Sequence, residues 1–253
     1  RQLPGAFFAS AGYVATRTVG QLGIRNINAA PPGGGTAGRA LYGPFRRAVD
    51  TSLYKQFLSA RYDSLQTTLD RRFSKGVMMK LAYTWGKAID YTDDSGGGLT
   101  WNLDSQFQRN RALAGFDRAH TFRWAWAAEL PFGGGRRWAN QNPAARALLG
   151  GWQLNGIFSS YSGLPFSVSS SGTTLNAPGN SQTADQVKSE VKKLGGVGPG
   201  TPFYDPTAFA AVREVRFGNT GRNILRGPGV VNLDGSLFRS FKLSERWKGQ
   251  FRA

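Results

Sequence analysis

Residues 115–138 read GFDRAHTFRWAWAAELPFGGGRRW, and large apolar side chains recur there at every second position. One parity holds Phe122, Trp124, Trp126, Ala128, Leu130 and Phe132, and the other holds Thr121, Arg123, Ala125, Ala127 and Glu129. Successive side chains of a β-strand point to opposite faces, so the pattern predicts a strand with one aromatic face and one small or charged face. Its length of about eleven residues is enough for a tilted strand to cross a bilayer.

The same period recurs along the chain. Including the first stretch, it predicts seven strands, which begin near residues 6, 60, 77, 119, 148, 232 and 247. The clearest hairpin joins residues 60–73 to residues 77–90 through the turn Ser74-Lys75-Gly76, and its first strand could extend back toward Val49. One polar patch, DQVKSEVKKL from Asp185, fits a short amphipathic helix instead.

The connections between these strands alternate in length. Residues 19–48, 90–117 and 163–230 form long loops, whereas residues 74–76, 133–147 and 244–246 form short or moderate turns. In an up-and-down meander, alternate connections lie on opposite rims, as in outer-membrane barrels with long extracellular loops and short periplasmic turns. No run of eighteen apolar residues is present, so no membrane-spanning helix is expected. The prediction is an all-β fold, part of an antiparallel up-and-down transmembrane β-barrel with about seven strands.

The two faces of the predicted strands are expected to contact different surroundings, lipid on one side and the barrel lumen on the other. Aromatic residues toward strand ends are typical of the girdles at both membrane interfaces, and polar residues at the intervening positions are typical of a lumen. The residues predicted to face lipid or form a girdle are Tyr83, Trp85, Phe122, Trp124, Trp126, Phe132, Trp152 and Trp247. The polar residues predicted to face the lumen are Lys80, Arg123, Glu129, Gln153, Asn155 and Lys242. Alternation alone also fits a soluble β-sandwich, so the alternative is a soluble or surface-attached β-rich adhesin or binding module with long loops.

The charge balance raises the question of a nucleic-acid partner. The chain has 32 Lys and Arg against 15 Asp and Glu, a net charge of +17. The basic residues are scattered and cluster only as pairs, such as Arg46 with Arg47 and Arg136 with Arg137. A nucleic-acid-binding protein usually has a basic stripe or block, so no nucleic-acid partner is expected. A cationic lumen, or loops that face lipid phosphates, would use the same charge without clustering.

Catalytic and metal-binding signals are weak. His120 is the only histidine, and it lies near Asp117 at the entry of a strand with no nucleophile motif. Asp90, Asp93 and Asp94 lack the spacing and terminal glutamate of a calcium loop and are expected to form a solvated acidic loop, with a weak calcium site as the alternative. The chain contains no cysteine, which excludes disulfides and thiolate chemistry. We therefore expect no enzymatic activity and no cofactor.

Four blocks in this order resemble a known family: YDSLQTTLDRRFSKGVMMKLAYTWGKAID, FDRAHTFRWAWAAELPFGGGRRW, LLGGWQLNGIFSSYSGLPFSV and FGNTGRNILRGPGVVNLDGSLFRSFKLSERWKGQFRA. They are similar to the C-terminal barrel of TonB-dependent outer-membrane receptors, above all to the Oar-like group. The resemblance implies a location in the outer membrane of a Gram-negative bacterium, contact with its lipid, and binding or uptake of an extracellular ligand. Uptake in that family is driven by the TonB system through a plug domain. Residues 1–253 are accordingly expected to be a barrel fragment that lacks the plug and the N-terminal regulatory-like domain, and the barrel is expected to continue past Ala253 to a terminal aromatic residue.

Overall fold

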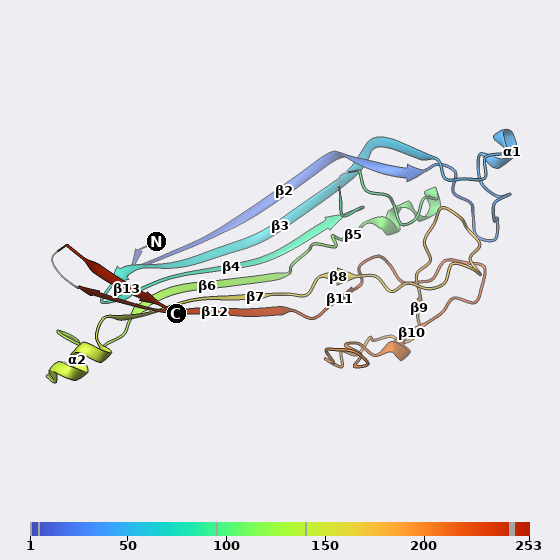
Figure 1. Ribbon diagram of the computed structural model, residues 1–253. Coiled ribbons are helices and arrows are strands. Elements are labelled where there is room, and N and C mark those ends of the chain that lie inside the picture. Colours follow the sequence, from blue (N-terminus) through green and yellow to red (C-terminus); the bar gives the residue numbers. More distant parts are fainter. Residues whose placement is uncertain (1, 5, 95, 140, 243–245) are drawn as a thin grey trace.

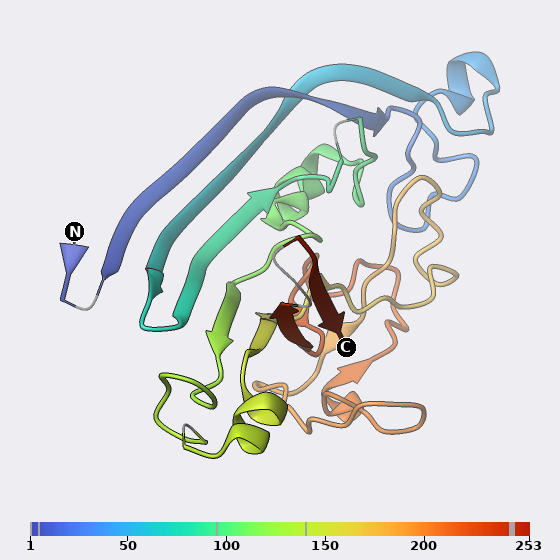
Figure 2. The ribbon, with the colours of Figure 1, turned by 60° about the vertical axis from the view of Figure 1, so that its left-hand side comes forward.

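The structure is a computed structural model that describes residues 2–4, 6–94, 96–139, 141–242 and 246–253. It is dominated by one antiparallel sheet whose long strands lie side by side in the order in which they follow one another along the chain. The sheet contains, in spatial order, β1 (Gln2–Leu3), β2 (Phe7–Asn26), β3 (Ser52–Ser74), β4 (Val77–Asp90), β6 (His120–Glu129), β7 (Trp152–Tyr161), β12 (Val230–Lys242) and β13 (Lys248–Arg252). The all-β meander is confirmed. The described strands form an open, curved sheet and not a closed barrel (Figures 1 and 2).

The first two long strands exceed their predicted lengths. The sequence predicts β2 over residues 6–18, but the strand continues to Asn26. It continues across a β-bulge, which shifts the register against β3 between Val19 and Leu22. Gly20 lies in this bulge with φ of 69°, a conformation that glycine adopts without steric cost. The bulge interrupts the two-residue period while the hydrogen-bonded ladder continues, so alternation alone could not reveal the outer third of the strand.

The turn between β3 and β4 has the predicted chemistry. Lys75 and Gly76 both adopt positive φ, 51° and 80°, as a type I′ hairpin turn requires. The next connection differs from its prediction. The helix α2 (Pro143–Leu149) occupies part of it, capped by the Asn142 side chain, which accepts from the Ala144 and Ala145 amides at 2.9 and 3.1 Å. β7 therefore begins at Trp152 and not at residue 148.

The three long connections, residues 27–51, 91–119 and 162–229, gather at one end of the sheet (Figure 1). They contain α1 (Tyr42–Phe45), η1 (Asp104–Asn110), β5 (Ala112–Leu113), which pairs with β4, η2 (Pro206–Ala208), and the two-residue pairs β8 (Pro165–Phe166) with β11 (Leu225–Arg226) and β9 (Asp185–Gln186) with β10 (Phe209–Ala210). The helix predicted from Asp185 is wrong, because that backbone is extended and pairs with β10. The shorter connections lie at the opposite end, as predicted from their lengths.

Buried apolar residues lie mainly at the end with the long connections. Leu58 of β3 packs with Tyr91 and Leu99, and Phe57 and Phe107 flank them, so η1 is held inside the bend of the sheet (Figure 2). Along the sheet itself, large apolar side chains stay exposed. Contiguous exposed apolar surface of this kind marks an interaction with another apolar phase. Among the described residues, no helix is long and apolar enough to cross a membrane.

Candidate functional site

The pairing register gathers the predicted apolar residues on one face of the sheet. Leu81, Trp124, Phe158 and Leu233 lie in one row across β4, β6, β7 and β12. The neighbouring rows pair Tyr83 with Phe122, Trp85 with His120, and Met79 with Trp126. We call this surface the aromatic face. In β4 and β12 it comprises the odd-numbered residues, and in β6 and β7 the even-numbered residues. The residues of β2 and β3 that are paired in the same rows also belong to it.

Packing on the aromatic face explains one glycine. The rings of Trp124 and Trp126 lie with centroids 4.3 Å apart, and Trp126 extends over Gly156 of the next strand. A Cβ atom at Gly156 would overlap the indole ring of Trp126. The glycine therefore provides the space in which the two tryptophans lie against the sheet. Its partner Gly235 is different, because a Cβ atom there would have no neighbour within 4 Å.

The aromatic face is bounded by charges at both ends. On β3 the apolar positions Leu65 and Leu69 lie between Asp63 and Arg71, which share their face. About eight residues separate the two charges, which at ~3.3 Å per residue is roughly 26 Å along the strand. Lipid-facing apolar bands of transmembrane barrels are ~25 Å tall. Because strands of such barrels are tilted by ~40°, this length covers roughly 20 Å of membrane depth, most of the height of such a band.

Three predicted girdle residues lie outside the central rows. Phe132 follows the end of β6 and contacts Trp138 within the connection, with ring centroids 5.5 Å apart and the rings tilted by 38°. Trp152, the first residue of β7, contacts Phe251 at 5.9 Å and lies under the Arg239 guanidinium at 5.3 Å. Trp247 directly precedes β13 and is 71% exposed. All three are at the end with the short connections, where one girdle was predicted.

The opposite surface, which we call the polar face, carries the residues predicted for the lumen. Arg123 donates to the Tyr161 hydroxyl at 2.9 Å, and Gln153 donates to Asn155 at 2.6 Å. Glu129 forms an ion pair with Arg136 of the following connection. Lys80 is exposed and lies beside Ala125 and Asp70 in the register, while the side chain of Lys242 lies outside the described residues. Met78, Ile157 and Phe238 are apolar residues on this face.

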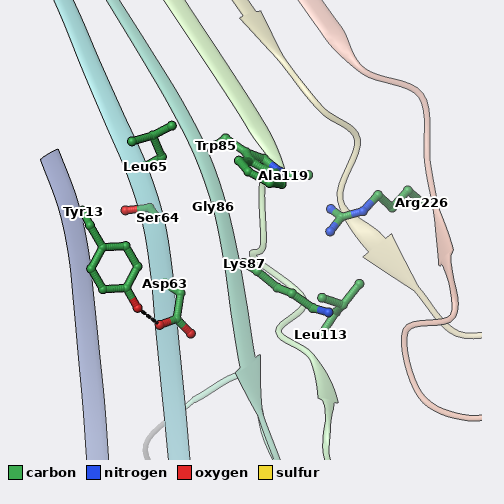
Figure 3. A pocket seen from close by; sticks show the side chains of 10 residues that line it. All are labelled: Tyr13, Asp63, Ser64, Leu65, Trp85, Gly86, Lys87, Leu113, Ala119 and Arg226. Carbon is green, nitrogen blue, oxygen red and sulfur yellow. Dashed lines mark hydrogen bonds between the residues drawn. The ribbon is translucent and has the colours of Figure 1, made fainter. Parts of the chain in front are cut away.

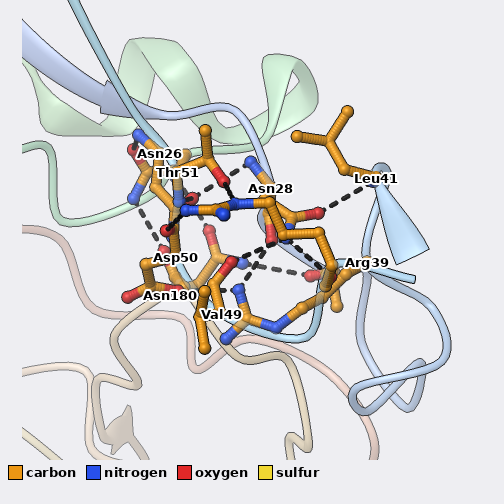
Figure 4. Close-up of polar contacts among 12 residues, drawn as sticks. Asn26, Asn28, Arg39, Leu41, Val49, Asp50, Thr51 and Asn180 are labelled. Atoms are coloured by element: carbon orange, nitrogen blue, oxygen red, sulfur yellow. Dashed lines mark hydrogen bonds and ion pairs between the residues drawn. The ribbon is translucent and has the colours of Figure 1, made fainter. Parts of the chain in front are cut away.

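At the end with the long connections, asparagine side chains join the loops into one layer (Figure 4). Asn28 donates to the carbonyls of Arg47 and Val49 and accepts from the Leu41 amide, with distances of 2.7–3.0 Å. Asn102 accepts from the Asn26 amide at 2.7 Å and donates to the Gly179 carbonyl at 2.7 Å. Each amide satisfies backbone groups that have no secondary-structure partner, so the layer is held in one conformation.

Arginines join the same layer to the strand ends. Arg222 is buried and forms ion pairs with Asp90 and with Asp93, the latter at 3.0 Å. Arg226 pairs with Asp117, which is also buried. The prediction that Asp90 belongs to a solvated acidic loop is wrong, since its carboxylate is enclosed beside Arg222. Among the described residues, no three histidine or acidic side chains are grouped to hold a metal ion.

Two further ion pairs hold the long loop at its surface. Hydrogen bonds from Lys188 and Thr207 lower the pKa of Asp205 to about 2. The Arg216 guanidinium lowers the pKa of Asp185 through two hydrogen bonds of 2.7 and 2.9 Å. Both carboxylates stay charged at neutral pH and fix the segments that carry them. Asp185 therefore lies in extended backbone, where its carboxylate is paired with Arg216.

His120 and Asp117, which the sequence places three residues apart, have separate partners. The His120 ring contacts the Tyr83 hydroxyl at 2.8 Å, and it lies on the aromatic face opposite Trp85. Asp117 accepts from the backbone amide of Ala88 and pairs with Arg226. The imidazole of His120 and the carboxylate of Asp117 thus have different hydrogen-bond partners, and the two groups are not paired with each other.

Comparison with known proteins agrees with this geometry. A family model described as an outer membrane beta barrel domain matches residues 1–253. No curated protein and no solved structure matches the chain. The family match contradicts the soluble form of the alternative. The chain belongs to the outer membrane beta barrel domain family, and its location is the outer membrane of a Gram-negative bacterium.

Proposed function

We propose that this chain is a barrel segment of a TonB-dependent receptor of the Oar-like group, which binds an extracellular ligand for energised uptake. In this proposal the aromatic face contacts the hydrocarbon core and the polar face lines the lumen. The layer formed by residues 27–51, 91–119 and 162–229 lies outside the cell. The order of the four sequence blocks supports the receptor family, and the family match supports its membrane location.

The observation that carries the proposal is the folding of the long connections into a single layer. Asn102 bridges residues 91–119 to residues 162–229, and Asn180 donates to the Ala30 carbonyl at 3.1 Å, which joins residues 162–229 to residues 27–51. Arg222 ties the longest loop to Asp90 at the end of β4. A rigid, preorganised loop surface loses little conformational entropy when a ligand binds. A pore that only needs to stay open has no need of such a layer, whereas a receptor gains affinity from it.

The orientation can be tested with single cysteines, because the chain has none of its own. Val197 in the longest loop is 72% exposed, Phe45 of α1 is 73% exposed, and Lys75 lies in the short turn between β3 and β4. Val197→Cys and Phe45→Cys are expected to react with a membrane-impermeant maleimide on intact cells. Lys75→Cys is expected to react only after the outer membrane is permeabilised. Labelling of Lys75→Cys alone on intact cells would invert the orientation.

Coupled uptake and simple adhesion are separated by a second measurement. The complete protein, purified in detergent, is expected to bind the purified periplasmic domain of TonB and to retain it on an affinity column. An outer-membrane β-barrel protein of the same size that does not depend on TonB serves as the control. If the complete protein retains no more TonB domain than this control, energised uptake is wrong, and a surface-attached binding module becomes the better account.

A further inference from the structure

Cationic side chains cluster just beyond the aromatic face at its extracellular end. Tyr13, Leu65 and Trp85 form the last aromatic row across β2, β3 and β4. Two residues further along, on the same face, the next row contains Asp63 and Lys87, about 7 Å away along the strands. The row after that pairs Arg17 with Arg61 and Ile89, and Ile89 pairs with Leu113 of β5, two residues after Arg111. We call Arg17, Arg61, Lys87 and Arg111 the outer-rim patch.

Asp63 positions two of the cationic side chains of this patch and offsets only one of its four positive charges. Its carboxylate accepts from Arg17 at 2.7 Å, from Arg61 at 2.9 Å and from the Tyr13 hydroxyl, so two guanidinium groups are fixed side by side. The side chains of Lys87 and Arg111 form no hydrogen bond or ion pair with a described residue. Four cations and one carboxylate leave a local charge of +3. Arg17 also donates to the Thr16 and Tyr62 carbonyls at 3.0 and 3.1 Å, and the N–H groups that remain on the two guanidinium groups can donate to an anion with several oxygens.

A largely apolar groove of about 470 Å³ adjoins the patch, and Asp63, Lys87 and Arg226 are among the residues that line it. Figure 3 shows Tyr13, Leu65 and Trp85 along its wall, with Lys87 extending toward Leu113. Tyr13 is 68% exposed and Trp85 is 58% exposed, so both rings present their surface to the membrane side. The groove therefore offers apolar contact at the depth of acyl chains, with cations at the depth of headgroups.

Cations at the other end of the aromatic face are differently engaged. Arg71 donates to the Ser74 carbonyl at 3.2 Å and lies over the Phe7 ring. Arg239 donates to the carbonyls of Gly150 and Ala147. These guanidinium groups complete turns of their own chain. On the aromatic face, among the described residues, the outer-rim patch combines unpaired cations with an open apolar groove.

We infer that the outer-rim patch and its groove bind a phosphorylated glycolipid of the outer leaflet. Its phosphate lies between Arg17, Arg61 and Lys87, and an acyl chain lies along Tyr13 and Trp85. Charge complementarity selects the phosphate, and the alignment of the patch with the upper edge of the apolar band selects a lipid over a soluble anion. The inference rests on the orientation proposed above, in which this rim meets the outer leaflet.

The test uses the complete protein in nanodiscs that contain either a phosphorylated or a chemically dephosphorylated lipid A, with bound lipid counted by native mass spectrometry after delipidation. The variant Lys87→Gln with Arg111→Gln removes the two unpaired cations and leaves the Asp63 contacts intact. Retention of phosphorylated lipid A is expected to fall about 30-fold, which is the effect of two cations near an anionic surface. The matched control, Lys55→Gln with Arg213→Gln, removes the same charge from the outer part of β3 and from the longest loop, and it should retain the lipid like the parent.

Three outcomes would overturn the inference: equal retention by both double variants, equal retention of dephosphorylated lipid, or displacement of the lipid by millimolar inorganic phosphate. Cysteine labelling at Val197 and binding of the TonB domain are measured on the same variants. If both are as expected while lipid retention is unchanged, only the lipid site is wrong. Inverted labelling would instead overturn the proposed orientation of the receptor.

Discussion

Replacing Trp124 with arginine is expected to lower the free energy of unfolding by up to ~2–4 kcal/mol, because the substitution places a charge inside the lipid-facing band. Trp124 lies in the row of Leu81 and Phe158, which on β3 contains Leu69, six residues from Asp63 and two residues from Arg71. A guanidinium at this depth must reach the interface or draw water into the hydrocarbon. Urea titration of the complete protein in phospholipid vesicles, followed by tryptophan fluorescence, measures the change.

The matched control is the next residue. Ala125 lies on the polar face of the same strand, beside Lys80, so Ala125→Arg introduces the same charge at the same depth toward the proposed lumen. Its expected cost is well under that of Trp124→Arg. Equal destabilisation by the two substitutions would show that the faces of β6 do not differ in solvent. A larger cost for Ala125→Arg would reverse the assignment of lipid and lumen.

The alternation of apolar and polar residues predicted the sheet because each strand places mainly apolar side chains on one face and mainly polar or small side chains on the other. In β6 every aromatic ring from Phe122 to Trp126 falls on the face that its neighbours also leave apolar, and the register confirms the pairing of Leu81 with Trp124. A shift by one residue would transfer all of these rings to the polar face, so the pattern also fixes the register. Fold class and face membership could thus be obtained from the sequence.

The loop layer could not be predicted in the same way. Its contacts join residues that are far apart in the chain, as Asp90 and Arg222 are, and no local pattern marks such pairs. Asn28 and Asn102 are ordinary loop asparagines in the sequence, and only the structure shows that their amides complete the hydrogen bonds of other loops. The bulge at Gly20 is a similar case, because a single glycine in a strand pattern has several explanations.

Replacing Arg222 with methionine is expected to destabilise the loop layer by about 3–5 kcal/mol, because the buried Asp90 carboxylate would lose its counter-charge. Arg222 also donates to the Asn110 carbonyl at 3.0 Å, so its removal leaves a second buried acceptor unpaired. Hydrogen exchange of the complete protein, read on peptides from residues 91–119 and 162–229, reports the local opening. Exchange in these peptides should accelerate roughly 10²–10⁴-fold, the same free-energy change expressed as an opening equilibrium.

Arg216→Met is the control, because it breaks an exposed ion pair with Asp185 in the same loop and should cost only about 0–1 kcal/mol. A pH series then identifies the cause. Burial raises the pKa of Asp90, and Arg222 opposes that rise, so removing Arg222 raises the pKa further. An acid with a raised pKa in the folded state gains stability as the pH falls through that pKa, so the loss in Arg222→Met should be smaller at pH 5 than at pH 8. A loss that is equal at both pH values would mean that missing packing, and not a stranded carboxylate, weakens the layer.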